Sequence, residues 1–483
     1  MKKCLFILFV ISLLTGCNKL DFNENIKMPT KTTATTKFNV SLKSVNTLLG
    51  ILGKNDSTKK IDKVEPIIHS GDTLLYIVNY QNNKGWKIIS GDKRTANILA
   101  SDNTGSFNIK DLKSNIAVWF DDLAEHIYAL KLEGKADTTG VDYKLWTNIE
   151  KLQLYQNQSK GMNKVIQPAP IEEGYWELVN ITSDTLPPVQ IGPLIQTKWG
   201  QNYPWNTCVP FTDANNTKRC KVGCTVVAGA QVLYYFHYKT GIPANAPEEG
   251  TCFGYSTNPG GIFDRTQVFF SFGNPNSSSW NNMATSAVFD QTSEAYLGSS
   301  GTNYSAIFLG YVGESMNTRF GENGSSNYVS DLINVIRTNG IWCNWETDYN
   351  YSTVLANLAN NVPVIVFANS HGLAQGFLGI YYRINDINHS WIIDGTITQT
   401  IKYTYYYQMI NTGGGGGLLG PALVQPLISD YKTEESYYTS TYLTMNWGTD
   451  GESDGGQYSL TDGWPVNSYN FCYDRTMVSG FSN

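Results

Sequence analysis

Residues 223–238 read GCTVVAGAQVLYYFHY and predict a helix that begins at a cysteine. The bulky apolar residues recur at mixed three- and four-residue intervals, as on a helix that is buried on most of its surface. This spacing places Cys224 at or just before the first helical turn. There the unpaired N–H groups and the helix dipole favour thiolate over thiol, so Cys224 is a candidate nucleophile. On these residues alone, a small buried structural cysteine is the favoured alternative, until a histidine partner is found.

The chain begins with MKKCLFILFVISLLTGC, which has the pattern of an export signal. Two lysines precede an apolar run over residues 4–14 that is too short to span a bilayer as a mature helix. The LTGC that follows resembles a bacterial lipobox, whose cysteine is lipidated. We therefore expect residues 1–16 to be a lipoprotein signal peptide and the exported protein to be anchored to a membrane through lipid on Cys17. The alternative is an ordinary cleaved signal, with Cys17 incidental.

The charge content divides the rest of the 483-residue chain into two parts. Residues 18–190 contain 21 Lys or Arg and 20 Asp or Glu. The longer segment 191–483 contains only 12 Lys or Arg, with 21 Asp or Glu. Because the change falls in proline-containing chain, we expect a flexible tether over residues 17–36, a first domain over 37–185 and a second over 190–483. The acidic second domain offers no basic stripe for phosphates, which argues against a nucleic-acid partner.

Hydrophobic periodicity predicts an α+β fold. In the first domain, strand patterns over residues 72–80 and 85–90 precede a helical pattern over residues 109–132. In the second domain, the helix after Cys224 precedes a further helical pattern and then a series of strand patterns. The helical pattern covers residues 330–337, and the strand patterns cover residues 362–367, 379–384, 390–394 and 403–409. Helix first and sheet afterwards is an α+β order.

Six cysteines follow Cys17 in the sequence: Cys208, Cys220, Cys224, Cys252, Cys343 and Cys472. An exported domain permits disulfides, and Cys208 and Cys220 are close enough in sequence to form a local pair. If Cys224 is a free nucleophile, an odd number remains, so at least one more must be unpaired. No CxxC pairs with a second CxxC and no histidine lies at zinc-finger spacing, so we expect neither a metal nor a cofactor.

Of the five histidines, His389 is the best candidate for a general base. His237 lies on the same predicted helix as Cys224, more than three turns away, and cannot meet the thiol. His389 opens the strand pattern HSWIIDG, whose backbone would hold the imidazole ring. The alternative base is His371, in the loop pattern NSHG.

Three more side chains would complete such a site. Asn446, in TMNWG, has an amide that accepts from an imidazole N–H without adding charge, and Trp447 would shield that bond from water. Gln201 precedes Cys224 by 23 residues, in the aromatic segment KWGQNYPW. Its amide is the candidate hydrogen-bond donor to an oxyanion.

Together these motifs resemble the streptopain family of papain-like cysteine proteases. The matching stretches are TKWGQNYPWNTCVP, VGCTVVAGAQVLYY, HSWIIDG and MNWG, in that order. The resemblance implies a papain-like α+β fold in which the helix of the nucleophile packs on an antiparallel sheet. It also implies these roles: Cys224 as nucleophile, His389 as base, Gln201 as oxyanion donor, Asn446 as the residue that orients the histidine, and Trp447 as its aromatic cover.

The first domain is similar to the inhibitory propeptide of the same family, on the segment GWKIISGDKRTANILASDNTGSF. The resemblance implies a zymogen that acts on protein or peptide substrates and carries its own intramolecular inhibitor. We expect a cut between about residues 175 and 195, because linkers are where nicking concentrates. Such a cut would also release the catalytic domain from its lipid anchor as a secreted enzyme.

The sequence departs from the family in three ways. MNWG is followed by Thr449-Asp450-Gly451 instead of a second Trp-Gly. Residues 396–436 look like an insertion between the base and the orienting residue, and the chain has more cysteines than familiar members. Two other functions fit the composition or the fold: a non-catalytic surface lipoprotein that binds glycan or peptide, and an amidase or transpeptidase acting on cell-wall peptides.

Overall fold

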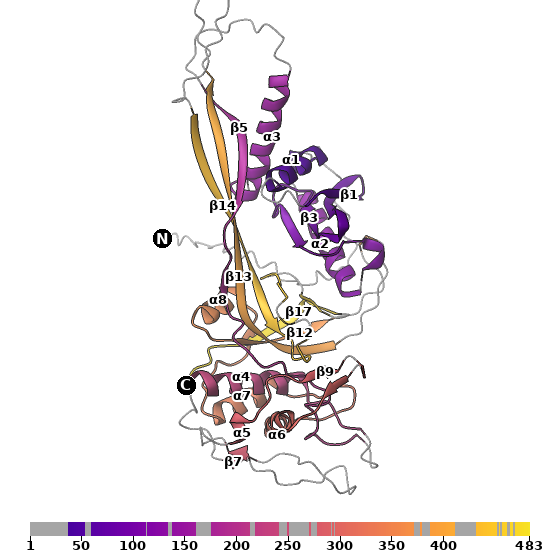
Figure 1. Ribbon diagram of the computed structural model, residues 1–483, viewed down its shortest axis with the longest axis vertical. Helices are drawn as coiled ribbons and strands as arrows, with labels where there is room; N and C mark the ends of the chain where they lie inside the picture. Colours follow the sequence, from indigo (N-terminus) through magenta and orange to yellow (C-terminus); the bar gives the residue numbers. More distant parts are fainter. Residues whose placement is uncertain are drawn as a thin grey trace, which may run out of the picture.

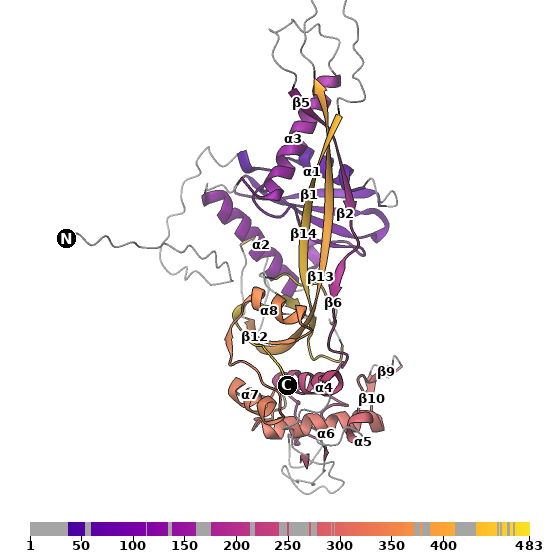
Figure 2. The same ribbon diagram turned by 90° about the vertical axis from the view of Figure 1, so that its left-hand side faces the viewer.

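The structure is a computed structural model of the whole chain. It describes residues 37–53, 59–112, 114–133, 138–160, 175–212, 218–240, 249–250, 270–271, 278–290, 292–293, 295–370, 377–378, 387–410, 431–451, 454, 456–460, 464–466 and 469–483. Figures 1 and 2 show an elongated molecule, with the first part of the chain packed beside a long β-ribbon that rises from the second part. Within the described residues, no helix is long and apolar enough to cross a membrane.

The N-terminal domain, residues 37–160, is a four-stranded antiparallel sheet with helices packed on it. The strands are β1 (Ile61–His69), β2 (Asp72–Tyr80), β3 (Trp86–Ser90) and β4 (Ile98–Asp102), and the helices are α1 (Leu42–Gly53), α2 (Ser114–Glu133) and α3 (Val141–Lys160). The strands predicted at 72–80 and 85–90 are confirmed. The pattern predicted as one helix over 109–132 is a short 3₁₀ turn (Ile109–Asp111) followed by α2.

The C-terminal domain, residues 186–483, packs helices on a sheet whose order is β11-β17-β12-β13-β14. These strands are β11 (Thr347–Asp348), β17 (Tyr473–Val478), β12 (Val364–Ser370), β13 (Ile387–Ile410) and β14 (Tyr431–Asn446). The main helices are α4 (Cys224–Thr240), α6 (Ser300–Ser315), α7 (Val329–Thr338) and α8 (Tyr351–Ala359). The α+β prediction is confirmed, with the helix that carries Cys224 packed on an antiparallel sheet.

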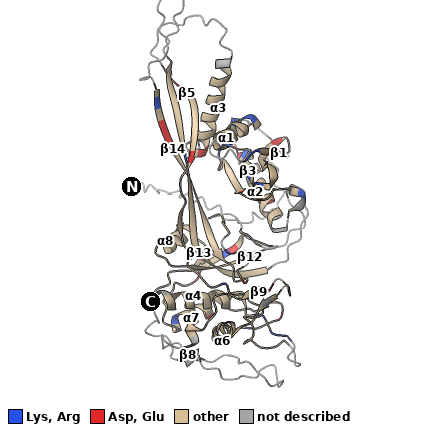
Figure 3. Cartoon of the chain, in the orientation of Figure 1, with Lys and Arg blue, Asp and Glu red and all other residues tan. Residues whose placement is uncertain are grey.

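Short elements complete this domain. They are β6 (Val189–Ile191), β7 (Glu249–Gly250), β8 (Phe270–Ser271), α5 (Ser278–Asn281), β9 (Val288–Asp290), β10 (Ala295–Leu297), β15 (Trp464–Val466) and β16 (Tyr469–Phe471). Few charged residues lie on its helices: in Figure 3, α4 and α6 are mostly tan, while blue and red segments gather on the N-terminal domain and on β14.

Alternation along β13 gives the C-terminal sheet a separate core on each face. Ile392 belongs to the core formed with α4 and α7, whereas its neighbours Trp391 and Ile393 belong to the core formed with α8. Successive side chains of a strand point to opposite faces, so a shift of one residue exchanges the two sets.

The long strand β13 joins two predicted strands into one. The patterns at 390–394 and 403–409 lie in a single 24-residue strand, and the predicted strand at 379–384 lies outside the described residues. The described ends of the predicted insertion, residues 396–410 and 431–436, extend β13 and β14 as a hairpin. β5 (Tyr175–Thr185), placed by prediction in the first domain, pairs with residues 401–410 of that hairpin.

The predicted disulfide between Cys208 and Cys220 is not formed, although both residues are buried. Backbone hydrogen bonds hold the segment instead. The Cys220 N–H donates to the Pro210 carbonyl over 2.9 Å, and the Asn206 amide donates to the Cys220 carbonyl over 3.0 Å. Cys208 packs its backbone against the bare Gly310 of α6.

Candidate active site

Cys224 is the first residue of α4, as the sequence predicts. The Gly223 carbonyl accepts the helical hydrogen bond of the Val227 N–H over 3.0 Å, so Gly223 occupies the N-cap position. Gly223 has φ +102°, a conformation that favours glycine, and a Cβ there would meet the Ser325 Cβ at 3.0 Å. The half-buried thiol therefore starts the helix where unpaired N–H groups stabilise a negative charge.

His389 lies near the start of β13, opposite Ala368 of β12. Its Nε2 lies 2.9 Å from the Trp447 carbonyl oxygen. A carbonyl only accepts, so Nε2 carries the proton and donates, which leaves Nδ1 for the hydrogen bond with the Cys224 thiol. The alternative base, His371, lies outside the described residues.

The pairing of thiol and imidazole changes the pKa of both groups. Burial alone would raise the pKa of Cys224, but the positive charge of His389 and hydrogen bonds from His389 and Ser390 outweigh it and lower the pKa to about 6. Burial likewise opposes the charged form of His389, but the hydrogen bond and charge of Cys224 and the Trp447 carbonyl raise its pKa. Both shifts favour the charged form of the pair, a thiolate and an imidazolium.

Sequence reasoning missed Ser390, which follows the histidine. Its hydroxyl lies 2.9 Å from the Thr225 hydroxyl, and its side chain and backbone both help to lower the pKa of Cys224. Ser390 is buried. Because successive side chains of a strand point to opposite faces, Ser390 lies on the face of β13 that packs against α4, and His389 lies on the other face. A serine directly after the candidate base was the available signal.

Gln201 lies beside the segment that leads into α4. Its backbone carbonyl accepts a hydrogen bond from the N–H of Val222 over 3.0 Å, and Val222 lies two residues before Cys224. Two aromatic residues that flank it, Trp199 and Trp205, are fully buried, as expected for a rigid segment, whereas Tyr203 is 54% exposed. The structure thus brings Gln201 to the start of the helix that carries the thiol.

The Asn446 side chain makes no hydrogen bond to His389, which differs from the prediction. Its Oδ1 accepts from the Gln231 Nε2 over 2.8 Å and from the Gly448 N–H over 3.2 Å, and its Nδ2 donates to the Thr197 carbonyl over 2.7 Å. The orienting hydrogen bond to the ring comes from the backbone of Trp447 instead.

Strand register explains this difference. Asn446 is paired with Ile392, so both side chains lie on the face of the sheet that packs against α4. His389 is three residues before Ile392 and points to the opposite face. Sequence spacing alone does not reveal this register.

Gln231 of α4 is a second residue that the sequence reasoning missed. Besides donating to Asn446, this buried amide accepts from the Trp199 N–H over 3.3 Å. It therefore connects α4, the end of β14 and the segment that carries Gln201. The sequence feature that could have indicated this role is an amide side chain within the apolar part of the helix.

Trp447 is fully buried and lies nearly parallel to the His389 ring, at 10° and with 6.1 Å between centroids. Its backbone N–H donates to the Asp454 carboxylate over 2.9 Å and its indole N–H to the Tyr458 hydroxyl over 3.0 Å. Burial raises the pKa of Asp454 to about 6. These bonds fix the peptide whose carbonyl holds His389.

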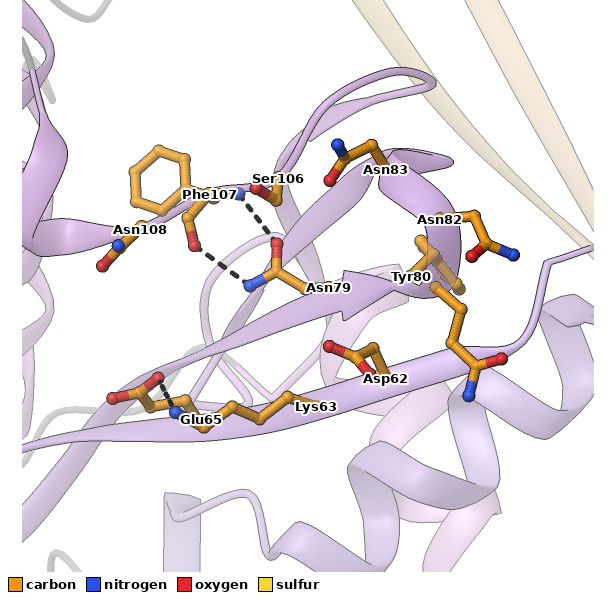
Figure 4. Close-up of a pocket in the computed structure, with 11 residues that line it drawn as sticks. Asp62, Lys63, Glu65, Asn79, Tyr80, Asn82, Asn83, Ser106, Phe107 and Asn108 are labelled. Carbon is orange, nitrogen blue, oxygen red and sulfur yellow. Dashed lines mark hydrogen bonds and ion pairs between the residues drawn. The ribbon is translucent and has the colours of Figure 1, made fainter.

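Within the described residues, no group of three or more His, Cys, Asp or Glu is arranged to hold a metal. A hollow of about 600 Å³ lies elsewhere, on the N-terminal domain. In Figure 4 its polar walls come from the β1–β2 region and residues 106–108, where the Asn79 amide bonds both the N–H and the carbonyl of Phe107. Its lining residues all belong to residues 62–108, so it has no part in the thiol–imidazole pair.

The thiol–imidazole pair on a helix and an antiparallel sheet defines a papain-like cysteine peptidase, and comparison with known proteins agrees. Residues 199–456 match the Peptidase C10 family, and residues 30–127 match the Spi protease inhibitor family. The chain belongs to the Peptidase C10 family, the streptopain family, and carries an N-terminal Spi propeptide domain.

Two solved structures are similar to this chain. One is active wild-type interpain A, a cysteine protease of Prevotella intermedia, at 24% identity and a TM-score of 0.35; the match covers 60% of this chain and 94% of that one. The other is a prointerpain A fragment from the same organism, at 18% identity and a TM-score of 0.38, covering 86% of this chain and 97% of that one. No curated protein matches the chain.

Proposed function

We propose that this cysteine peptidase hydrolyses peptide bonds through Cys224 and His389, as an endopeptidase made in a latent form. The observation that carries the proposal is the pairing of a helix-initiating thiol, with its pKa lowered to about 6, and an imidazole whose other nitrogen is held by the Trp447 carbonyl. The thiolate is the reactive nucleophile, and the imidazolium can act as the general acid that protonates the leaving amine.

In the proposed reaction, the Cys224 thiolate attacks the carbonyl carbon of the scissile peptide. The resulting oxyanion accepts hydrogen bonds from the Cys224 backbone N–H and the Gln201 side chain. His389 gives its proton to the leaving amine, the C–N bond breaks, and a thioester remains. His389 then takes a proton from water, the hydroxide attacks the thioester, and the thiolate leaves.

The proposed role of Asn446 differs from the one first expected, and Trp447 has a second role besides that of aromatic cover. The Trp447 carbonyl orients the imidazole, and its indole ring covers one side of it. Asn446 is a positioning residue that acts through Gln231 and the backbone around Gly448.

Hydrolysis of an unfolded protein substrate by the matured protein tests this proposal. We expect Cys224→Ala and His389→Ala to abolish cleavage, whereas Cys220→Ala, which removes a nearby buried thiol of raised pKa, keeps it. Cleavage that survives Cys224→Ala would overturn the assignment.

We further propose that the N-terminal domain keeps the enzyme latent in cis. This is supported by two contacts of α2 with segments near His389, a connection between strands and the short strand β16. The Asp121 carboxylate accepts from the N–H groups of Phe377 and Leu378, over 2.5 and 2.6 Å, in the connection between β12 and β13. Asn470 of β16 donates to Asp122 over 3.4 Å, next to Phe471, whose ring lies 5.6 Å from that of His389.

If the enzyme matures itself, purified precursor will shorten to a fragment that begins between residues 175 and 195, while Cys224→Ala stays full-length. An uncut wild-type chain with full activity would contradict latency.

Export and lipidation of Cys17 are also part of the proposed function. They are supported by the LTGC pattern, which lies outside the described residues. Mass spectrometry of the membrane fraction will find a lipid-modified N-terminal cysteine, and Cys17→Ala will move the precursor out of that fraction. A precursor that stays in the membrane fraction after this change would refute the anchor.

A further inference from the structure

The hairpin formed by β13 and β14 extends well beyond the catalytic sheet. We call its outer part the arm: β5 (Tyr175–Thr185), residues 401–410 of β13 and residues 431–438 of β14. Residues 401–410 pair with β5 on one edge and residues 401–408 with β14 on the other, so the arm is a three-stranded antiparallel ribbon. In Figures 1 and 2 it rises from the sheet of the C-terminal domain and runs beside α3.

The two faces of the arm differ in chemistry. One face carries Tyr403 and Tyr405 of β13, with exposures of 1% and 4%, and Leu178 and Ile181 of β5, with exposures of 4% and 0%. The opposite face is polar, and the Lys402 ammonium there lies 2.7 Å from the Glu435 carboxylate. Tyr437 also lies on the polar face, half exposed, with its hydroxyl donating to Glu435.

The apolar face is buried by the N-terminal domain. Its tyrosines and the β5 residues belong to one hydrophobic cluster with α1 and α3. The contributors from those helices include Leu48, Leu49, Ile51, Trp146, Ile149 and Leu152. The Ser183 hydroxyl also donates to the Ile51 carbonyl over 3.3 Å, inside the same contact.

A narrow ribbon with one apolar face is not stable alone, because its apolar side chains would face water. Here that face and the helices of the N-terminal domain form a single core. This contact is made by α1 and α3 and not by the α2 residues that reach the His389 region, and it needs no continuous chain between α3 and β5.

We propose that the arm is the docking surface for the N-terminal domain and keeps that domain bound after the chain between α3 and β5 is cut. Latency would then outlast a cut between α3 and β5, which lies ahead of the range 175–195 expected for maturation. This rests on the proposed latency in cis, but it concerns binding and is testable without catalysis.

The test uses the full chain carrying Cys224→Ala, with a recognition site for an unrelated protease inserted between Lys160 and Tyr175. After complete cutting, size-exclusion chromatography at micromolar concentration measures whether the N-terminal domain elutes with the remainder. We expect co-elution. Immediate separation of the cut fragments would overturn the proposal.

Two variants locate the contact on the arm. Tyr403→Ser with Tyr405→Ser should shorten the half-time of release at least tenfold, whereas Tyr437→Ser, the same change on the polar face, should leave it unchanged. If the double variant holds the N-terminal domain as long as Tyr437→Ser does, the contact at Asp121 suffices and the arm is not the docking surface.

A single-site variant covers the case in which the double variant fails to fold. Ser183→Ala removes the hydrogen bond to Ile51 without disturbing the apolar packing, and it should shorten the half-time two- to fivefold. Near-ultraviolet circular dichroism of each uncut variant verifies its folding. A folded Ser183→Ala variant with an unchanged half-time would count against the proposal.

Discussion

Replacing His389 with alanine should return Cys224 to the reactivity of an ordinary buried thiol. The structure lowers the pKa of Cys224 from 9.0 to about 6, and His389 supplies the largest lowering contributions, its charge first. Without them, burial dominates and raises the pKa, so the titration midpoint in His389→Ala should lie at or above the ordinary value. Alkylation can measure this difference in the pKa of Cys224 between the wild type and His389→Ala.

The expected size of the effect follows from the shift. At pH 6, about half of Cys224 is thiolate in the wild type, against about one in a thousand for a thiol of pKa 9.0. A thiolate of lower pKa is also a weaker nucleophile, by about 30-fold for three units with a Brønsted coefficient near 0.5. The net expectation at pH 6 is alkylation about 15-fold faster than for an unperturbed thiol.

The assay is the rate of iodoacetamide modification of Cys224 from pH 4 to 10, followed by mass spectrometry of the tryptic peptide. In the wild type the rate rises through pH 6 and then levels, because the thiolate forms above its pKa. In His389→Ala the rate at pH 6 falls and keeps rising past pH 9. Ser390→Ala, which loses smaller contributions, should lie between them. A wild-type midpoint near 9, or one unchanged in His389→Ala, would refute the thiolate–imidazolium pair.

Three other results are expected. Gln201→Ala should lower kcat about 10²- to 10³-fold without moving the alkylation midpoint, because it removes a donor to the oxyanion alone; an unchanged kcat would remove Gln201 from that role. Asn446→Ala should lower the free energy of unfolding by about 1–3 kcal/mol, since Gln231 loses a buried acceptor. The pH midpoint of Cys224 alkylation should stay unchanged in this variant. A midpoint that moves as it does in His389→Ala would show that Asn446 orients the imidazole ring. In uncut precursor, Asp121→Asn should raise activity about tenfold, because a charge-assisted acceptor of two backbone N–H groups is lost; unchanged latency would show that this contact is dispensable.

The start of α4 and the base were predictable because the signal is local. Apolar periodicity located the helix, and glycine before Cys224 agrees with the positive φ that the turn requires. His389 follows from a strand pattern that places a histidine where sheet backbone holds it. Both predictions depend on residues within about one element of the side chain in question.

The partner of His389 was not predictable, because it depends on strand register. Asn446 and the carbonyl of Trp447 are neighbours in sequence, yet the pairing with Ile392 turns the amide toward α4. The role of the inserted hairpin was hidden for a similar reason. The helices that bury Tyr403 and Tyr405 lie more than 240 residues earlier in the chain.

In the proposed reaction, Cys224 forms a thioester with the acyl part of the substrate. Rapid acid quenching of the matured enzyme with a peptide ester, followed by mass spectrometry, measures that intermediate directly. We expect one acyl group per molecule, on Cys224, and none in His389→Ala. Turnover of the ester with the acyl group on another residue, or with no acyl-enzyme at all, would contradict it.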